Sequence, residues 1–224
     1  VTVRHAGADT LPLRSWSSDD PYLYTVEAEL VVNGEKTDAQ QLTTGFRAVS
    51  YDKDRGLRIN GAVQWLRGYA QRAANEWAAI GIALEWLHDE DAARIRESYA
   101  NHIRFMHVAG SPADVRAFDR RGIVCTQPAG DKEKESFGRQ WDQRVELMRD
   151  VIIAFRNHPS ILFWEAGNNS ISREHMREMR LLKQRLDPHG GRFIGCRTLN
   201  TEEVVNESEY VGTKLNRHAA RFLS

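Results

Sequence analysis

The sequence predicts an α/β protein in which a β-rich segment, residues 1–55, precedes alternating strands and helices over residues 56–224. In the first segment, Tyr22–Val32 is rich in aromatic and β-branched residues with partial alternation, and no helical period is visible. From about residue 91 onward, apolar residues recur every three or four positions between short apolar runs. Strands and helices that alternate along a chain form parallel βα units, so we expect a parallel sheet there.

Two turn signals divide the β-rich part of the chain. Asn33-Gly34 follows Tyr22–Val32 and predicts a hairpin whose return strand is Gln41–Tyr51. Asn60-Gly61 lies inside Gly56–Gly68 and predicts a second hairpin. With no helical pattern nearby, this part is expected to be the end of a small β-sandwich.

Helical patterns and short apolar runs define the βα units. The first helix begins at Asp91 and carries Ala92, Ile95 and Tyr99 on one face. Ser111 is a candidate N-cap, because a proline follows it at the first helical position. Further helices are expected at residues 112–122, 138–157 and 172–186, and strands at residues 101–108, 123–126, 161–165, 192–197 and 209–215.

The formal charge of the chain is balanced, with 31 basic and 31 acidic side chains. Bulk charge therefore favours neither nucleic acid nor an anionic membrane as a partner. No apolar run approaches the ~18–20 residues that a membrane span needs. The chain begins at Val1 without a recognisable signal peptide, so we expect it to be processed or cut from a longer protein.

The two cysteines, Cys125 and Cys196, lie in predicted buried strands. We expect buried thiols, while a disulfide or a reactive thiol remains an alternative. C-x-x-C spacing is absent. We expect neither a metal site nor a cofactor.

The stretch Asn157–Asn169 (NHPSILFWEAGNN) combines a helix stop, a buried strand and a polar end. Pro159 ends the preceding helix, and Ile161–Trp164 suits a strand buried on both faces. The stretch resembles the "NHPSI-hydrophobic-W-x-x-GNE" segment of glycoside hydrolase family 2, the β-galactosidase and β-glucuronidase group. The resemblance implies a strand of a TIM barrel, the carboxyl end of which carries the chemistry.

Other segments resemble the same family: residues 16–24 (WSSDDPYLY), the GFR of residues 45–47, residues 56–68 (GLRINGAVQWLRG) and the N-x-x-R-x-x-H of residues 101–107. The resemblance implies an immunoglobulin-like segment over residues 1–55 and the N-terminal part of a (β/α)8 TIM barrel over residues 56–224. The second strand of the Asn60-Gly61 hairpin is then expected to be barrel strand one. Only about six of the eight strands fit. The family's nucleophilic Glu lies on strand seven, so we expect it beyond Ser224 and the 224-residue chain to be inactive by itself.

Asn169 stands where the family has the Glu that acts as general acid/base. A side-chain amide cannot supply a proton, so Asn169 cannot take over that catalytic role. Asn168 matches the preceding Asn, which in the family binds the sugar 2-hydroxyl. Glu165 is the nearest carboxylate, and three roles are open to it: a relocated acid/base or sugar ligand, a buried partner of an Arg or His on a neighbouring strand, or a water-facing side chain.

Other positions are candidate substrate contacts. His107 matches the family's strand-two His at the sugar site, and Trp164 matches the Trp before the active-site loop, although each also suits a structural role. Most of the family's remaining sugar and metal ligands are replaced, but Gln71, Arg72 and Gln127 are polar. Arg72 could pair with a carboxylate of the substrate or with Glu165.

Two functions remain open. The first is a glycoside hydrolase that cleaves β-glycosidic bonds of a poly- or oligosaccharide, decorated or acidic, with an atypical acid/base arrangement. The second is a non-catalytic carbohydrate-binding or scaffold relative, which Asn169 favours. An engineered change at Asn169 is disfavoured, because several other family motifs are altered too. A carbohydrate partner and a homo-oligomer fit either function, and the family alone suggests a periplasmic or secreted location.

Overall fold

The computed structural model describes residues 13–72, 84–130, 135–169, 171–198 and 202–212. Its main feature is a six-stranded sheet in which neighbouring strands follow one another in sequence and run parallel. The strands are β6 (Gly68–Gln71), β7 (His102–Phe105), β8 (Val124–Pro128), β9 (Ile161–Gly167), β10 (Phe193–Cys196) and β11 (Tyr210–Val211). This order, with helices between strands, is that of a partial (β/α)8 barrel, and it confirms the predicted fold class.

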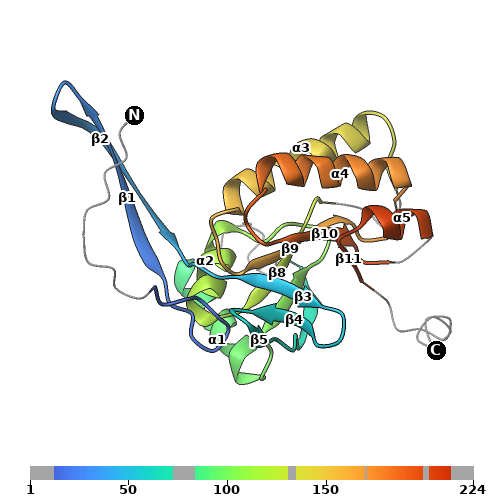
Figure 1. Cartoon of the computed structure of the whole chain (residues 1–224), viewed down its shortest axis with the longest axis horizontal. Coiled ribbons are helices and arrows are strands. Elements are labelled where there is room, and N and C mark those ends of the chain that lie inside the picture. The colour runs from blue at the N-terminus through green and yellow to red at the C-terminus, as the bar shows by residue number, and fades with distance from the viewer. Residues whose placement is uncertain (1–12, 73–83, 131–134, 170, 199–201, 213–224) are drawn as a thin grey trace.

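Helices cover the outer face of this sheet. They are α1 (Glu85–Glu97), α2 (Pro112–Arg121), α3 (Arg139–Phe155), α4 (Arg173–Leu186) and the short α5 (Glu202–Glu207). Figure 1 shows α3 and α4 side by side over β9 and β10, and a single apolar cluster joins these helices to the sheet. The opposite face of the sheet is the inner face of the barrel, which we call the lumen face.

Local sequence explains where α2 and α4 begin and end. Ser111 and Asp114 form a reciprocal capping box at the start of α2, and Gly122 ends it in the left-handed conformation with φ 68°. Ser172 caps α4, accepting a hydrogen bond from the backbone N–H of His175. These boundaries agree with the predicted ones.

The β-rich segment forms two antiparallel sheets. One is the hairpin of β1 (Tyr24–Val32) and β2 (Glu35–Thr44), joined by the predicted Asn33-Gly34 turn with both φ angles positive. The other contains β3 (Val49–Asp52), β4 (Gly56–Ile59) and β5 (Ala62–Val63). The predicted return strand Gln41–Tyr51 is thus wrong: β2 starts directly after the turn, and residues 49–51 pair with β4 instead.

Barrel strand one also differs from the prediction. The second strand of the Asn60-Gly61 hairpin is β5, which pairs antiparallel with β4, whereas barrel strand one is β6. Gly68 at the start of β6 lies so close to β7 that an added Cβ would be 1.6 Å from the carbonyl oxygen of His102. Gly68, which is predicted to end a strand, therefore begins the next one, because only glycine permits this close approach.

The first helix is longer than predicted at its start and shorter at its end. It begins at Glu85, and Ala92 and Ile95 face the core as expected. Tyr99 lies beyond the helix with φ 62°, and 82% of its surface is exposed. Its predicted place on the apolar face is wrong, because Ser98 already leaves the helical conformation.

Trp16 joins the β-rich segment to the barrel. Its side chain is fully buried, and its indole N–H donates to the backbone oxygen of Asp119 at 2.8 Å. Around it, Ile59 of β4 packs with Val124 and Leu162, which lie near the amino ends of β8 and β9. The β-rich segment therefore covers the amino-terminal end of the sheet, away from the edge that carries barrel chemistry.

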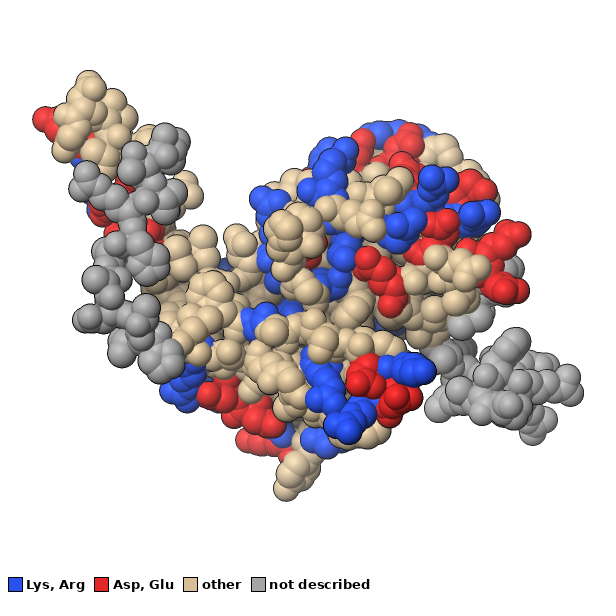
Figure 2. Space-filling view, viewed as in Figure 1, with Lys and Arg blue, Asp and Glu red and all other residues tan. Residues whose placement is uncertain are grey.

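Charges of both signs are interspersed on the face formed by α3 and α4, as Figure 2 shows. Exposed pairs such as Arg139–Glu146 lie there. Within the described ranges, no helix has both the length and the apolar composition needed to cross a bilayer. Cys125 and Cys196 are buried and not disulfide-bonded, which agrees with the expected thiols.

Candidate functional site

Near the carboxyl end of β9, an ion pair on the lumen face joins Glu165 to Arg104 of β7, two strands away in the sheet. Glu165 is 2% exposed and accepts two hydrogen bonds from Arg104 of β7, one of them from Nε to Oε2 at 2.6 Å. The remaining bond joins Arg104 Nη2 to Oε1. A bidentate guanidinium–carboxylate pair fixes the orientation of both side chains. Of the three roles open to Glu165, this geometry fits the buried partner of an arginine.

Asn168 and Asn169 follow β9 and are held by two arginines. Arg104 Nη2 donates to Asn168 Oδ1 at 2.8 Å, so the same guanidinium joins Glu165 to Asn168. Arg197, just after β10, donates from Nε to the Asn168 backbone oxygen at 2.9 Å and from Nη2 to Asn169 Oδ1 at 3.1 Å. The loop at the position of the family's acid/base is therefore fixed by side chains from β7 and β10.

Closer to the amino ends of the strands, aromatic and polar side chains contact one another on the lumen face. His102 lies 3.1 Å from the Thr126 hydroxyl through Nε2 and packs edge-on against Phe163. The Tyr210 ring contacts Phe163, with centroids 4.8 Å apart. Burial, followed by the nearby Arg104 cation, lowers the pKa of His102 to about 4. His102 is therefore neutral at pH 7.

We expect the stability of the fold to depend on His102 below neutral pH. Its pKa in the folded chain, about 4, lies below the ordinary value of 6.5. Between these two pH values, the unfolded chain therefore binds a proton at His102 that the folded chain does not bind. The contribution of neutral His102 to the free energy of unfolding is complete above pH 6.5 and is lost as the pH falls toward 4. Urea unfolding of the wild type and of His102→Gln at several pH values should show a shallower acid decline in the variant. Equal slopes would contradict the prediction.

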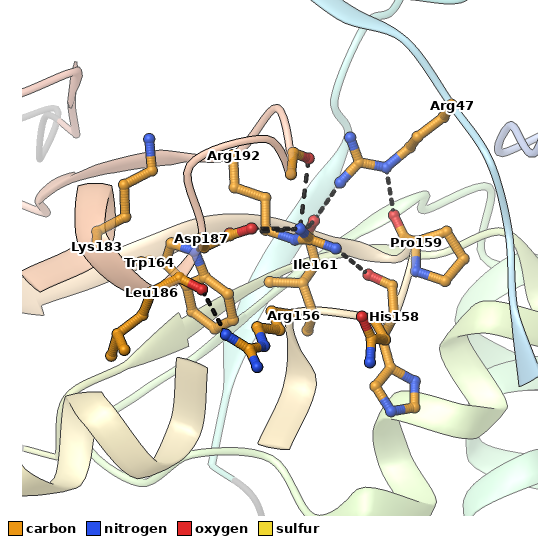
Figure 3. A network of polar contacts seen from close by, with 12 residues as sticks. Arg47, Arg156, His158, Pro159, Ile161, Trp164, Lys183, Leu186, Asp187 and Arg192 are labelled. Carbon is orange, nitrogen blue, oxygen red and sulfur yellow. Dashed lines mark hydrogen bonds and ion pairs between the residues drawn. The ribbon is translucent and has the colours of Figure 1, made fainter. Parts of the chain in front are cut away.

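The amino end of β9 is held by two further arginines, shown in Figure 3. Arg47, the last residue of the GFR segment, donates to the backbone oxygens of Pro159 and Ile161. Arg192 donates to the same Ile161 oxygen at 3.0 Å and also binds Asp187 at 3.0 Å. Burial, together with the neighbouring Arg192 charge, lowers the pKa of Arg47 to about 9. Both ends of the strand that carries the candidate site are thus fixed by buried guanidinium groups.

Some predicted site residues meet at the carboxyl edge of the sheet. Gln71 ends β6, and His107 follows β7 with φ 68°, so both lie at the same edge as Glu165, Asn168 and Asn169. Parallel strands place their carboxyl ends together, so this edge is the one that carries barrel chemistry.

Two of the predicted contacts are buried, and a third, Arg72, is exposed directly after β6. Trp164 is fully buried on the helix side of the sheet, where its indole N–H donates to Asp187 at 3.0 Å. Gln127 is also fully buried, and its Oε1 accepts from the backbone N–H of Gly110 in the segment before α2. Arg72 is exposed, and Arg104 takes the place considered for it beside Glu165. Trp164 and Gln127 therefore offer no surface to a sugar in this arrangement.

Two residues of the candidate site, Arg104 and Arg197, were not predicted from the sequence. A signal existed for Arg104, because alternation along His102–Phe105 puts Arg104 on the face opposite to the buried Ile103 and Phe105. Arg197 is the last residue of the predicted strand 192–197, so its basic group is expected at the carboxyl edge. In neither case does the sequence specify the carboxylate or amide partner.

A partial parallel barrel with buried polar groups at the carboxyl edge of its strands is the architecture of part of a TIM-barrel domain. Two family profiles match the chain: "Glycosyl hydrolases family 2, TIM barrel domain" over residues 52–213 and "Glycosyl hydrolases family 2" over residues 4–47. The chain belongs to glycosyl hydrolases family 2, as the motif resemblance implies.

Similar proteins include enzymes named for two sugars. A beta-glucuronidase of Formosa agariphila is 36% identical over 89% of this chain and 20% of that protein. A beta-glucuronidase of Bacteroides fragilis is 31% identical over 78% of this chain and 27% of that protein. A beta-galactosidase of Bacteroides ovatus is 29% identical over 68% of this chain and 19% of that protein. The chain thus spans about a fifth to a quarter of the length of these curated relatives.

Solved structures show the same fold. The structure of a beta-glucuronidase from glycoside hydrolase family 2 superposes with a TM-score of 0.77 at 36% identity, covering 82% of this chain and 19% of that one. Bacteroides uniformis beta-glucuronidase 3 superposes with a TM-score of 0.74 at 27% identity, covering 88% of this chain and 26% of that one.

Proposed function

We propose that the natural protein containing this chain hydrolyses β-glycosidic bonds of an oligo- or polysaccharide. The arrangement of Asn168 and Asn169 beside Arg104 and Arg197 carries the proposal, in a chain of glycosyl hydrolases family 2. Asn168 contributes an amide group at the carboxyl edge, where Gln71 ends β6 and His107 lies two residues after β7. Gln71 and His107 are proposed to hold hydroxyl groups of the sugar, and Asn168, which is 2% exposed, to fix the loop that carries Asn169.

The atypical position is Asn169. Glu165 lies four residues earlier, but both of its oxygens accept hydrogen bonds from Arg104. We therefore assign Glu165 to positioning Arg104 and, through it, Asn168. With no acid at residue 169, catalysis should be best on substrates whose leaving group needs little protonation.

The substrate class is proposed to be a β-glucuronide. Arg197 lies within 3.1 Å of Asn169, and arginine binds carboxylates with favourable geometry. Two of the similar proteins are named beta-glucuronidase, while a third is named beta-galactosidase. A galactoside is therefore the matched comparison substrate.

Turnover of aryl and alkyl β-glycosides by the intact protein tests this assignment. We expect hydrolysis of nitrophenyl β-glucuronide, slower hydrolysis of nitrophenyl β-galactoside, and little turnover of alkyl glucuronides. Asn169→Glu should raise turnover of the alkyl substrates by about 10²-fold, the lower range of general acid catalysis. The aryl substrates should change much less.

Two other outcomes would change the proposal. If Glu165→Gln abolishes hydrolysis of natural oligosaccharides but keeps most aryl turnover, Glu165 is the acid after all. If the wild-type protein hydrolyses no glycoside yet binds sugar, the non-catalytic carbohydrate-binding function replaces the hydrolase. Asn169 is the residue that favours this second function, because an amide has no proton to donate.

A further inference from the structure

An exposed aromatic side chain packs against the first turn of α4, the helix that follows the loop of the candidate site. Phe137 is 69% exposed and lies in the segment between β8 and α3, which follows the carboxyl end of β8. Residues 135–138 of that segment reach the start of α4, where the backbone N–H of Ser172 donates to Glu135. A single exposed aromatic residue is common on protein surfaces, so its support and its neighbours decide whether it has a role.

The Phe137 ring rests on a rigid support. It packs against His175 with the ring centroids 5.8 Å apart, and His175 stacks on Trp141 at 3.7 Å and 11°. Trp141 is 4% exposed, and its indole N–H donates to Glu178 at 2.7 Å. The three rings thus form a row from the surface into the core, which holds the exposed face of Phe137 in one place.

A carboxylate ties this row to the site loop. Glu135 accepts hydrogen bonds from His175 Nδ1 and from the backbone N–H of Ser172, both at 2.6 Å. Ser172 lies three residues after Asn169 in the sequence, at the end of the loop that carries the candidate site. The Glu135 side chain remains 20% exposed, so an acceptor for a hydroxyl group lies close to the exposed ring.

We propose that Phe137 is a stacking platform for a second sugar residue of an oligosaccharide substrate, with Glu135 as a hydrogen-bond acceptor beside it. A pyranose has an apolar face of C–H groups that packs on an aromatic ring, and hydroxyl groups at its edge that need polar partners. The inference rests on the proposed glycosidase function. The platform would give the enzyme a preference for oligosaccharides over glycosides of a single sugar.

Steady-state kinetics of the intact protein test the platform. Phe137→Ala should raise KM for a β-linked oligosaccharide by roughly tenfold and leave KM and kcat for the nitrophenyl monosaccharide unchanged. Phe137→Trp should keep the wild-type KM, since it preserves the ring face. The matched control is Tyr99→Ala, which removes an aromatic residue of similar exposure, 82%, at the amino end of β7 and should change neither substrate.

Failure of the platform and failure of the glycosidase function give different results. The platform is overturned if Phe137→Ala leaves KM for the oligosaccharide unchanged, or if it raises KM equally for both substrates. In either case, hydrolysis by the wild type still upholds the glycosidase function. If the wild type hydrolyses nothing, the function fails, and calorimetric binding of the oligosaccharide then decides the platform. Equal affinity of the wild type and Phe137→Ala would overturn it.

Discussion

Replacing Glu165 with leucine is expected to lower the free energy of unfolding by about 3–5 kcal/mol. The side chains of Glu165 and Arg104 are 2% and 13% exposed, so the change leaves a buried guanidinium without its carboxylate. Asn168 also depends on this guanidinium for a hydrogen bond at 2.8 Å. Urea unfolding of the chain would measure the loss, and sugar binding by the intact protein should weaken in parallel.

Two controls separate the buried charge from the loss of a side chain. The double variant Arg104→Leu/Glu165→Leu removes both charges and should be more stable than Glu165→Leu, because no unpaired ion remains. Glu146→Gln disrupts the Arg139–Glu146 pair, in which the side chains are 67% and 46% exposed, and should cost less than about 1 kcal/mol. A Glu165→Leu cost as small as that of Glu146→Gln would contradict a structural role for the ion pair.

The sequence predicts β9 and its neighbours well because their signals are local. Pro159 stops α3, the apolar run defines the strand, and Ser172 begins the next helix within a few residues. Barrel strand one is different. Gly68 reads as a strand end on local pattern, but its actual role depends on contact with His102 of β7, which is far along the chain.

The location of the candidate site could be predicted from the sequence, but the contacts of its side chains could not. The carboxyl edge follows from the order of parallel strands, and Asn168 and Asn169 lie there. Trp164 and Glu165 are adjacent, yet one faces the helices and binds Asp187 while the other faces Arg104. A run buried on both faces does not reveal which side chain enters the lumen, because both faces look apolar in sequence.

The contact between the β-rich segment and the barrel is expected to depend strongly on Trp16. Trp16→Ala should lower the free energy of unfolding by about 3–5 kcal/mol, because a fully buried indole leaves a cavity. The change also removes the hydrogen bond from the indole N–H to the Asp119 backbone oxygen, 2.8 Å long and joining residues far apart in sequence. Urea unfolding monitored by circular dichroism would measure the loss.

Trp16→Phe and Trp65→Ala locate the origin of this effect. Trp16→Phe keeps an aromatic ring in the cluster but has no N–H for Asp119, so its cost should fall between those of the wild type and Trp16→Ala. Trp65 is 75% exposed, and its removal should change stability by less than about 0.5 kcal/mol. Asp119 also binds His158 at 2.5 Å and the Ser160 backbone N–H at 3.0 Å, just before β9. A large loss of unfolding free energy in Trp16→Ala, together with a small loss in Trp65→Ala, would therefore identify Trp16 as a link between the β-rich segment and the strand that carries the candidate site. Equal losses would show that the two parts fold without this link.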